Sequence, residues 1–199
     1  MVVLDAGHGG ADEGAHGSNG MMESEVVLGF ARLARAELER QGLRVVMTRQ
    51  GNDNPSFDER SAVANAQRGA VFISLHVSST GPTGTARVYS VAAPAAAAPA
   101  TRATLLPWDQ AQGLYADSSR RLAELVQIQL AQKFRGSPDV PSIAPVRQLR
   151  TVALPAIAIE VSSIAVHERG QLEQMGLPLA EAVARAVMAF RPLYETGAK

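Results

Sequence analysis

The chain has 199 residues and no cysteine, and its 19 basic and 19 acidic residues give a formal net charge of zero. A chain of this length can bury one hydrophobic core, the balanced charge argues against a nucleic-acid partner, and the absence of thiols excludes disulfides and cysteine-based sites. No apolar run approaches the roughly 20 residues that a membrane span requires. We therefore expect one domain over residues 1–199 and no membrane span.

Strands and helices are predicted to alternate from the start of the chain. Residues 2–4 are apolar and predict a strand, which a Gly-rich loop over residues 7–20 follows. Residues 23–41 carry apolar side chains at helical spacing before Gly42, and residues 43–48 predict a second strand. This order is a strand, helix, strand unit.

The middle of the chain repeats this alternation and then loses it. A helix is expected over residues 57–68, a strand over 70–75 and an edge strand over 85–91. The next stretch, at about residues 92–106, is rich in alanine and proline, which interrupts helices, so we interpret it as a surface insertion.

The last third predicts a helix over residues 117–134, a core strand over 153–161 and a closing helix over 177–194. Alternating strands and helices favour an α/β fold with a mostly parallel sheet flanked by helices.

Two of the four histidines follow apolar runs that read as buried strands. His8 comes after residues 2–6, and His76 follows residues 72–75. If those strands are neighbours in a parallel sheet, both imidazoles lie at the edge where α/β folds bind ligands. Alone, His8 in its Gly-rich loop would equally suit a turn or a phosphate-binding loop, and His76 a structural role.

Acidic residues near these histidines suggest a metal centre. Two imidazoles and one carboxylate, with water in the open position, form the hydrolytic zinc arrangement. Glu23 and Glu25 both begin the first predicted helix, and two residues apart on a helix they point in different directions, so only one can share the metal. The pattern alone does not choose between them.

Glu160 ends the apolar run of residues 156–159. A carboxylate there is costly unless it has a partner, which suits a general base. His16 and His167 follow no buried strand and are expected to be solvated loop residues.

These residues carry a family resemblance over nearly the whole chain. In order, the matching segments are residues 4–10, 23–28, 48–49, Arg60 with residues 64–65, residues 72–76 and residues 154–161. Together they resemble the zinc-dependent N-acetylmuramoyl-L-alanine amidases of bacterial cell-wall turnover.

The resemblance implies a single α/β domain with about six strands, one zinc ion bound by His8, Glu23 and His76, and Glu160 as the catalytic glutamate. It also implies hydrolysis of the amide between N-acetylmuramic acid and the L-alanine of the peptidoglycan stem peptide, with zinc-bound water as nucleophile. Arg49, Arg60 and Asn65 match as scaffold residues that tie loops and helices together.

The chain departs from the family pattern after His76 and after Glu160. Residues 77–79 read Val-Ser-Ser where the family has Asn between small residues, and residues 162–166 replace the usual Gly-Phe and Ser-Asn. These changes concern the rim that contacts substrate, and they leave the four chemical groups in place.

The resemblance places the protein in the periplasm or outside the cell, with any signal and further domains outside this chain, and allows a protein activator. Two alternatives are another zinc amide hydrolase or deacetylase, and a degenerate amidase that binds wall without cleaving it. A further hypothesis is that Leu105, Leu106, Pro107 and Trp108 dock over the zinc cleft as a lid; the alternative is a surface loop whose Trp108 packs onto the core.

Overall fold

A computed structural model describes residues 1–17, 20–92, 107–165 and 169–197. Its strands are β1 (Val2–Ala6), β2 (Val45–Met47), β3 (Val71–Ser78), β4 (Thr85–Ser90), β5 (Ser142–Ile143) and β6 (Ala156–Ser162). Its helices are α1 (Glu23–Arg40), α2 (Phe57–Asn65), α3 (Ala116–Lys133), α4 (Arg147–Arg150), α5 (Arg169–Glu173) and α6 (Gly176–Gly197), with a 3-10 helix η1 (Trp108–Tyr115).

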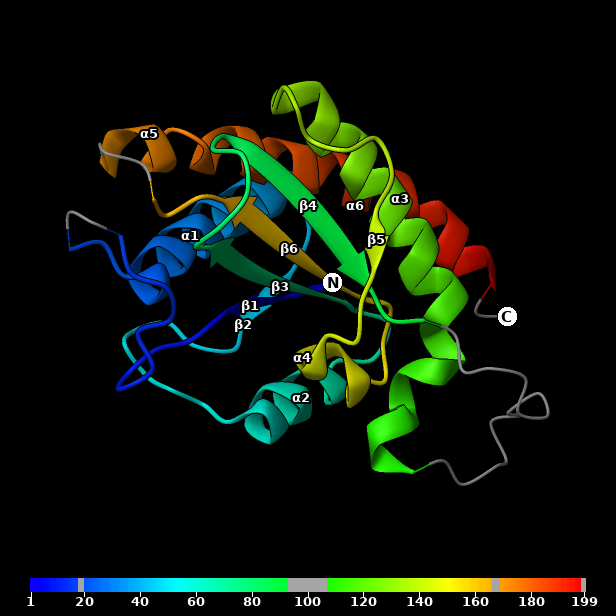
Figure 1. Cartoon of the computed structure of the whole chain (residues 1–199). Helices are drawn as coiled ribbons and strands as arrows, with labels where there is room; N and C mark the ends of the chain where they lie inside the picture. The colour runs from blue at the N-terminus through cyan, green and yellow to red at the C-terminus, as the bar shows by residue number, and fades with distance from the viewer. Residues whose placement is uncertain (18–19, 93–106, 166–168, 198–199) are drawn as a thin grey trace.

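The strands form one sheet in the order β2-β1-β3-β6-β4-β5. The first four strands in this order run parallel, β4 runs antiparallel to β6, and β5 is parallel to β4. The predicted α/β fold with a mostly parallel, six-stranded sheet is therefore confirmed (Figure 1).

Helices cover both faces of the sheet. On one face, α1, α3 and α6 pack together over side chains such as Leu4, Ile73 and Ile159, all without exposed surface. On the other face, a smaller cluster that includes Phe72 and Leu149 joins the sheet to α2 and α4. Because both faces are covered, the parallel strands read as continuous apolar runs, and this is why the sequence predicted them.

The expectation that β4 is an edge strand is wrong. The edge is β5, which pairs with Tyr89 and Ser90 at the end of β4. Two residues carry no detectable strand pattern, so the sequence does not predict β5, and it does not predict the short helices α4 and α5 either. Along the rest of its outer side, β4 is bonded by Gln127 of α3, which accepts from the Val88 N–H and donates to the Ala86 carbonyl.

The Ala/Pro-rich insertion lies almost wholly outside the described residues, because residues 93–106 are not described. His167 is outside them too. The described segment that follows the insertion is η1, whose Gln112 donates to the carbonyls of Val152 and Leu154 just before β6. This anchor lies at the opposite end of β6 from Glu160, and Trp108 is 55% exposed, so it does not pack into the core.

None of the helices in the described part of the chain combines the length and the apolar character needed to cross a membrane.

Candidate metal centre

Three of the predicted residues meet at the carboxyl ends of β1 and β3. His8 lies in the loop after β1, Glu23 is the first residue of α1, and His76 lies within β3. Their ligand atoms all lie within 4.8 Å of one another. The structure therefore brings His8, Glu23 and His76 into one cluster that could hold a metal ion.

One carboxylate oxygen occupies the centre of the cluster. Glu23 Oε1 lies 3.2 Å from His8 Nε2 and 3.0 Å from His76 Nδ1, and it also accepts the Val77 N–H at 2.9 Å. The other oxygen, Oε2, accepts the Ala15 N–H at 2.9 Å. Both oxygens are thus fixed by groups from different segments, and Glu23 is almost completely buried.

The loop before α1 explains how Glu23 reaches this position. The N–H groups of Glu23 and Ser24, which a helix cannot satisfy internally, donate to the carbonyls of Ala15 and Glu13. An acid in the first helical turn also interacts favourably with the helix dipole. Glu25, by contrast, is exposed and lies 3.6 Å from Arg169, so the structure separates the two candidate acids.

Hydrogen bonds hold each imidazole on its far side. Asp12 lies 2.9 Å from Nδ1 of His8, and the Ser74 hydroxyl lies 3.2 Å from Nε2 of His76. Such partners fix the orientation of a ligating imidazole. The other nitrogen of each ring, Nε2 of His8 and Nδ1 of His76, therefore faces Glu23. The two rings lie edge to face with centroids 5.2 Å apart.

The carboxylate of Glu23 and the imidazole of His8 each favour the charged form of the other. Burial would raise the pKa of Glu23, but hydrogen bonds with His76, His8 and the Ala15 N–H outweigh it and hold that pKa well below its ordinary value. The hydrogen bond to Glu23 raises the pKa of His8 despite opposing burial. Without an ion, the negative carboxylate thus attracts the cationic form of the imidazole.

A buried ion pair supports the floor of the site. Asp5 of β1 accepts from Arg60, Thr48 and Ser74, with the Arg60 Nη1 to Asp5 Oδ1 distance at 2.7 Å. Ser74 thereby links the Asp5 carboxylate to His76. The sequence pattern does not reveal this role of Asp5, because its partners lie 43 to 69 residues away along the chain.

The expected scaffold residues do connect distant segments. Arg49 donates to the carbonyls of Ala6, Gly7 and Ser24, and Arg60 also donates to the His8 carbonyl. His8 has a positive φ of 59°, an unusual conformation that these bonds hold in place. The remaining residue, Asn65, bonds the backbone of Thr151 and Ala153, and all three interpretations are confirmed.

Glu160 faces His76 across neighbouring parallel strands, at the same register position. It lines a cleft of 550 Å³ together with His8, Glu23 and His76. Tyr89 of β4 lines the same cleft; burial and then the neighbouring Glu160 carboxylate raise the pKa of Tyr89. A carboxylate therefore lines the cleft beside the cluster.

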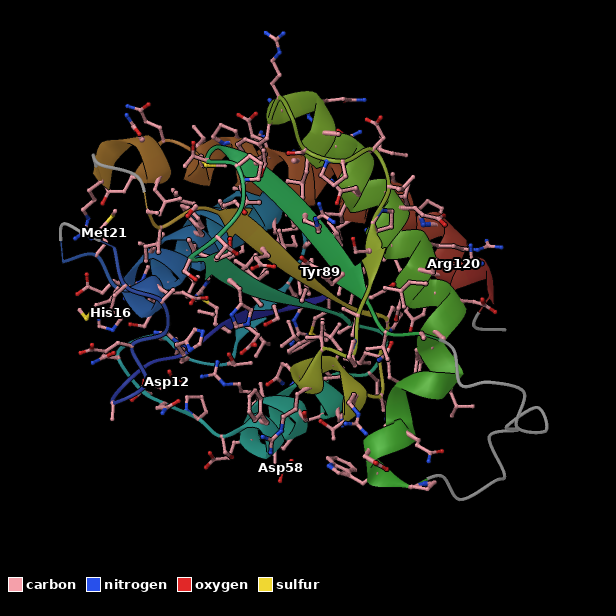
Figure 2. All side chains as sticks on the ribbon, viewed as in Figure 1. Asp12, His16, Met21, Asp58, Tyr89 and Arg120 are labelled. Atoms are coloured by element: carbon pink, nitrogen blue, oxygen red, sulfur yellow. The ribbon has the colours of Figure 1, made fainter. Side chains whose placement is uncertain are left out.

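His16 remains outside the cluster, exposed in its loop and 3.1 Å from Glu13, as expected. Figure 2 shows His16 and Asp12 on the loops at the same side of the molecule. None of the described residues of η1 lines the 550 Å³ cleft, so the described end of the proposed lid does not cover it.

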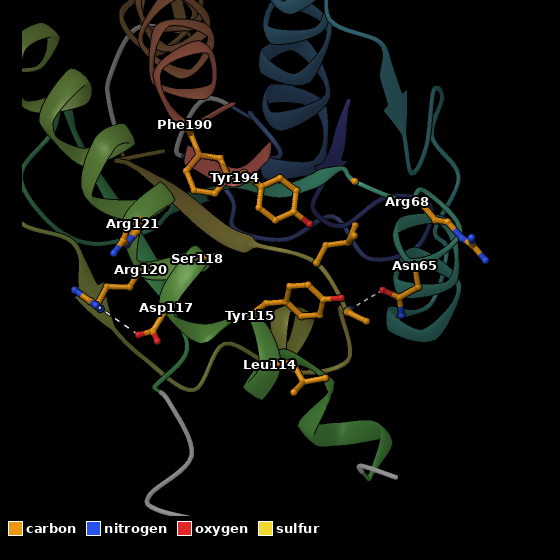
Figure 3. A pocket seen from close by; sticks show the side chains of 13 residues that line it. Asn65, Arg68, Leu114, Tyr115, Asp117, Ser118, Arg120, Arg121, Phe190 and Tyr194 are labelled. Atoms are coloured by element: carbon orange, nitrogen blue, oxygen red, sulfur yellow. Dashed lines mark hydrogen bonds and ion pairs between the residues drawn. The ribbon is translucent and has the colours of Figure 1, made fainter. Parts of the chain in front are cut away.

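A larger cavity of 750 Å³ lies at the other end of the sheet. Tyr115, Tyr194 and Arg121 line it, and Asn65 bonds the Ala153 N–H in its wall (Figure 3). It contains none of the four groups expected to carry chemistry. Size alone therefore does not identify the functional site, whereas the clustered donors do.

Comparison with known proteins identifies the family. The profile described as N-acetylmuramoyl-L-alanine amidase matches residues 2–188. The chain belongs to this amidase family. The AmiA amidase of Salmonella typhimurium is 40% identical over 76 residues, which are 38% of this chain and 26% of AmiA. The LytC amidase of Bacillus subtilis is 26% identical over 166 residues, or 82% of this chain and 29% of LytC. The matched part is thus about a quarter of the length of these relatives.

Solved structures show the same fold. The amidase AmiC2 of Nostoc punctiforme superimposes with a TM-score of 0.73 and 26% identity, covering 95% of each chain. The amidase Ami1 of Mycobacterium abscessus reaches a TM-score of 0.74 over 95% of this chain and 97% of its own, with 20% identity. This second likeness concerns the fold alone.

Proposed function

We propose that this chain is a zinc-dependent N-acetylmuramoyl-L-alanine amidase that hydrolyses the amide between N-acetylmuramic acid and the L-alanine of the peptidoglycan stem peptide. The observation that carries the proposal is the cluster of His8, Glu23 and His76 with Glu160 facing it across β3 and β6. Membership of the amidase family supports the choice of bond.

The donor set fits zinc. Two imidazole nitrogens and a carboxylate oxygen are the three protein ligands of many catalytic zinc sites, and an open position remains for water or substrate. His8, Glu23 and His76 would hold the ion. When bound, zinc would supply a Lewis acid that polarises the amide carbonyl and lowers the pKa of water.

Glu160 would move the protons of the reaction. Its carboxylate would accept a proton from the water that attacks the carbonyl carbon of the lactyl group, and would then donate that proton to the departing amine of L-alanine. Tyr89 lines the cleft beside this carboxylate, while Asp12 and Ser74 orient the imidazoles. The chain thus provides metal ligands, a base and groups that position them.

Two alternatives predict different outcomes from the same site. Another zinc amide hydrolase or deacetylase would use the same cluster on a different bond. A binding module would recognise wall without cleaving it, but such a module needs no partly buried carboxylate beside a metal cluster, and Glu160 argues against it. Peptidoglycan as substrate implies a periplasmic or extracellular location, and a protein activator stays a prediction.

Digestion of purified sacculi tests the function. We expect the purified protein to contain about one zinc per chain and to release stem peptides with a free L-alanine amine, detected by mass spectrometry. The variant His76→Ala should lose both zinc and activity, whereas His16→Ala, which changes an exposed histidine outside the cluster, should retain both. Full activity without metal, or cleavage of another bond, would refute the proposal.

A further inference from the structure

A second cavity lies on the side of β4, next to the 550 Å³ cleft that contains the cluster and Glu160 and is called the metal cleft below. It has a volume of 220 Å³, and Glu160 and Tyr89 line both this cavity and the metal cleft. Ser78 and Thr80 are also common to the two linings. When the scissile amide of a substrate lies between the cluster and Glu160, the neighbouring part of that substrate can therefore extend into this second cavity.

Arg87 is placed in this cavity by the strand register. Because β4 is antiparallel to β6, Arg87 is directly opposite Glu160, and directly opposed residues share one face of a sheet. The side chain is exposed and lines the cavity beside the glutamate. The backbone thus places Arg87 and Glu160 on the same face of the sheet, at paired positions.

The guanidinium of Arg87 has no carboxylate partner in the described part of the chain. Among the described residues, its Nη1 donates to the Ser142 hydroxyl at 3.0 Å, and no ion pair joins it to Glu160. The guanidinium of Arg60 also lines a cavity beside the cluster, but it already forms a buried ion pair with Asp5. Arg87 therefore has donors available for a ligand.

The rest of the cavity is polar and narrow. The hydroxyls of Ser78 and Ser162 lie 2.9 Å apart in its wall, and a Cβ added at Gly81 would lie 3.0 Å from the Ser162 hydroxyl oxygen. Hydroxyls and a cation suit a small anionic group better than an apolar side chain. A guanidinium donates in a planar fork that matches a carboxylate.

We propose that Arg87 is a specificity-determining residue that binds a free carboxylate of the stem peptide, beyond the L-alanine whose amide is cleaved. The inference rests on the proposed amidase function and adds the chemistry of the neighbouring subsite: an acidic peptide residue. Arg87 contributes to binding of that residue and takes no part in proton transfer.

Two soluble substrates isolate the carboxylate. One is N-acetylmuramoyl-L-alanyl-D-glutamate, and the other is the same molecule with both glutamate carboxyls converted to carboxamides. We expect the zinc-loaded wild type to cleave the carboxylate form with a kcat/KM roughly tenfold higher, the scale of a charge-assisted hydrogen bond at an exposed site. The difference should lie mainly in KM.

The variant Arg87→Gln should remove this preference by lowering kcat/KM on the carboxylate form alone, and Arg87→Lys should restore part of it as a point charge. The control Arg120→Gln changes an exposed arginine on α3, away from Tyr89 (Figure 2), and should leave the preference intact.

Equal cleavage of the two substrates by the wild type would overturn the inference while leaving the amidase function standing. An equal loss of kcat on both substrates in Arg87→Gln would also overturn it, since Arg87 would then act through Glu160. Failure of the zinc-loaded wild type to cleave the lactyl to L-alanine amide in either substrate and in sacculi would refute the proposed function itself.

Discussion

His76 and Glu160 occupy paired positions on β3 and β6, so an imidazole and a carboxylate of different chain segments are held side by side by the backbone bonding of two strands. Neighbouring strands are about 4.8 Å apart. The separation of the two side chains therefore depends on the sheet and not on a loop. Rigid elements of this kind hold functional groups more accurately than loops do.

The variant Glu160→Gln tests the role of the second group. We expect turnover on sacculi to fall by at least about a hundredfold, the usual effect of losing a positioned general base. Zinc content should not change, because Glu160 is outside the three-residue cluster. The matched control is Glu25→Gln, which changes an exposed acid near the site. Turnover close to normal in Glu160→Gln would assign the base to another acid.

The metal-free protein should be most stable relative to Glu23→Gln between about pH 4.5 and 6.5. The pKa of Glu23 is lowered by folding, so its contribution is present above its unfolded value of 4.5 and is lost as the pH falls. The pKa of His8 is raised, so its contribution is complete below 6.5 and is lost as the pH rises through the folded value. Thermal unfolding of the wild type and of Glu23→Gln in the presence of a chelator, across roughly pH 3 to 9, measures the difference in stability between the two proteins. A difference independent of pH would contradict this.

Loss of the buried cation at position 60 should destabilise the fold. In Arg60→Met, the carboxylate of Asp5 remains buried without its ionic partner, which costs about 3–5 kcal/mol. Urea unfolding measures the change. Arg120→Met, which breaks only surface pairs, should cost less than about 1 kcal/mol. Similar values for the two variants would show that Asp5 does not depend on Arg60.

Replacing Gln148 by an apolar residue should increase the stability of the fold. Its side-chain amide is buried on α4, and neither Nε2 nor Oε1 has a hydrogen-bond partner in the described chain. Because an orphaned buried polar group costs about 1–3 kcal/mol, Gln148→Leu should raise the free energy of unfolding by about 1 kcal/mol. Gln112→Leu is the contrasting control, since that amide bonds Val152 and Leu154 and its loss should destabilise. A destabilised Gln148→Leu would contradict the prediction.

The parts that sequence predicted well are those encoded locally. Residues 72–76 and 156–160 each carry a mostly apolar run and then a chemical group, so both the strand and the placement of that group at one sheet edge follow from the pattern. The choice of Glu23 over Glu25 did not follow from helical periodicity. It depends on the Ala15 and Val77 N–H groups, which reach the carboxylate from 8 and 54 residues away.

Other features were invisible for similar reasons. The proximity of Tyr89 to Glu160 in one cleft needs the antiparallel register of β4, and a strand pattern does not encode the direction in which a strand pairs. The two residues of β5 are too few to show periodicity. Long-range bonds and short elements therefore required the structure, whereas the alternation of strands and helices did not.

The metal cluster also depends on two positions that have no side chain. A Cβ at Gly7 would lie 2.4 Å from an atom of the His76 ring, and one at Gly14 would lie 2.7 Å from Glu23 Oε2 and 2.8 Å from the His8 ring. In a saturation scan, these glycines should therefore tolerate substitution as poorly as the ligands, although they donate nothing to a metal. Scanning data alone would count five essential positions at the cluster, of which only three carry side chains that could hold a metal, and only metal binding by the individual variants would separate the two groups.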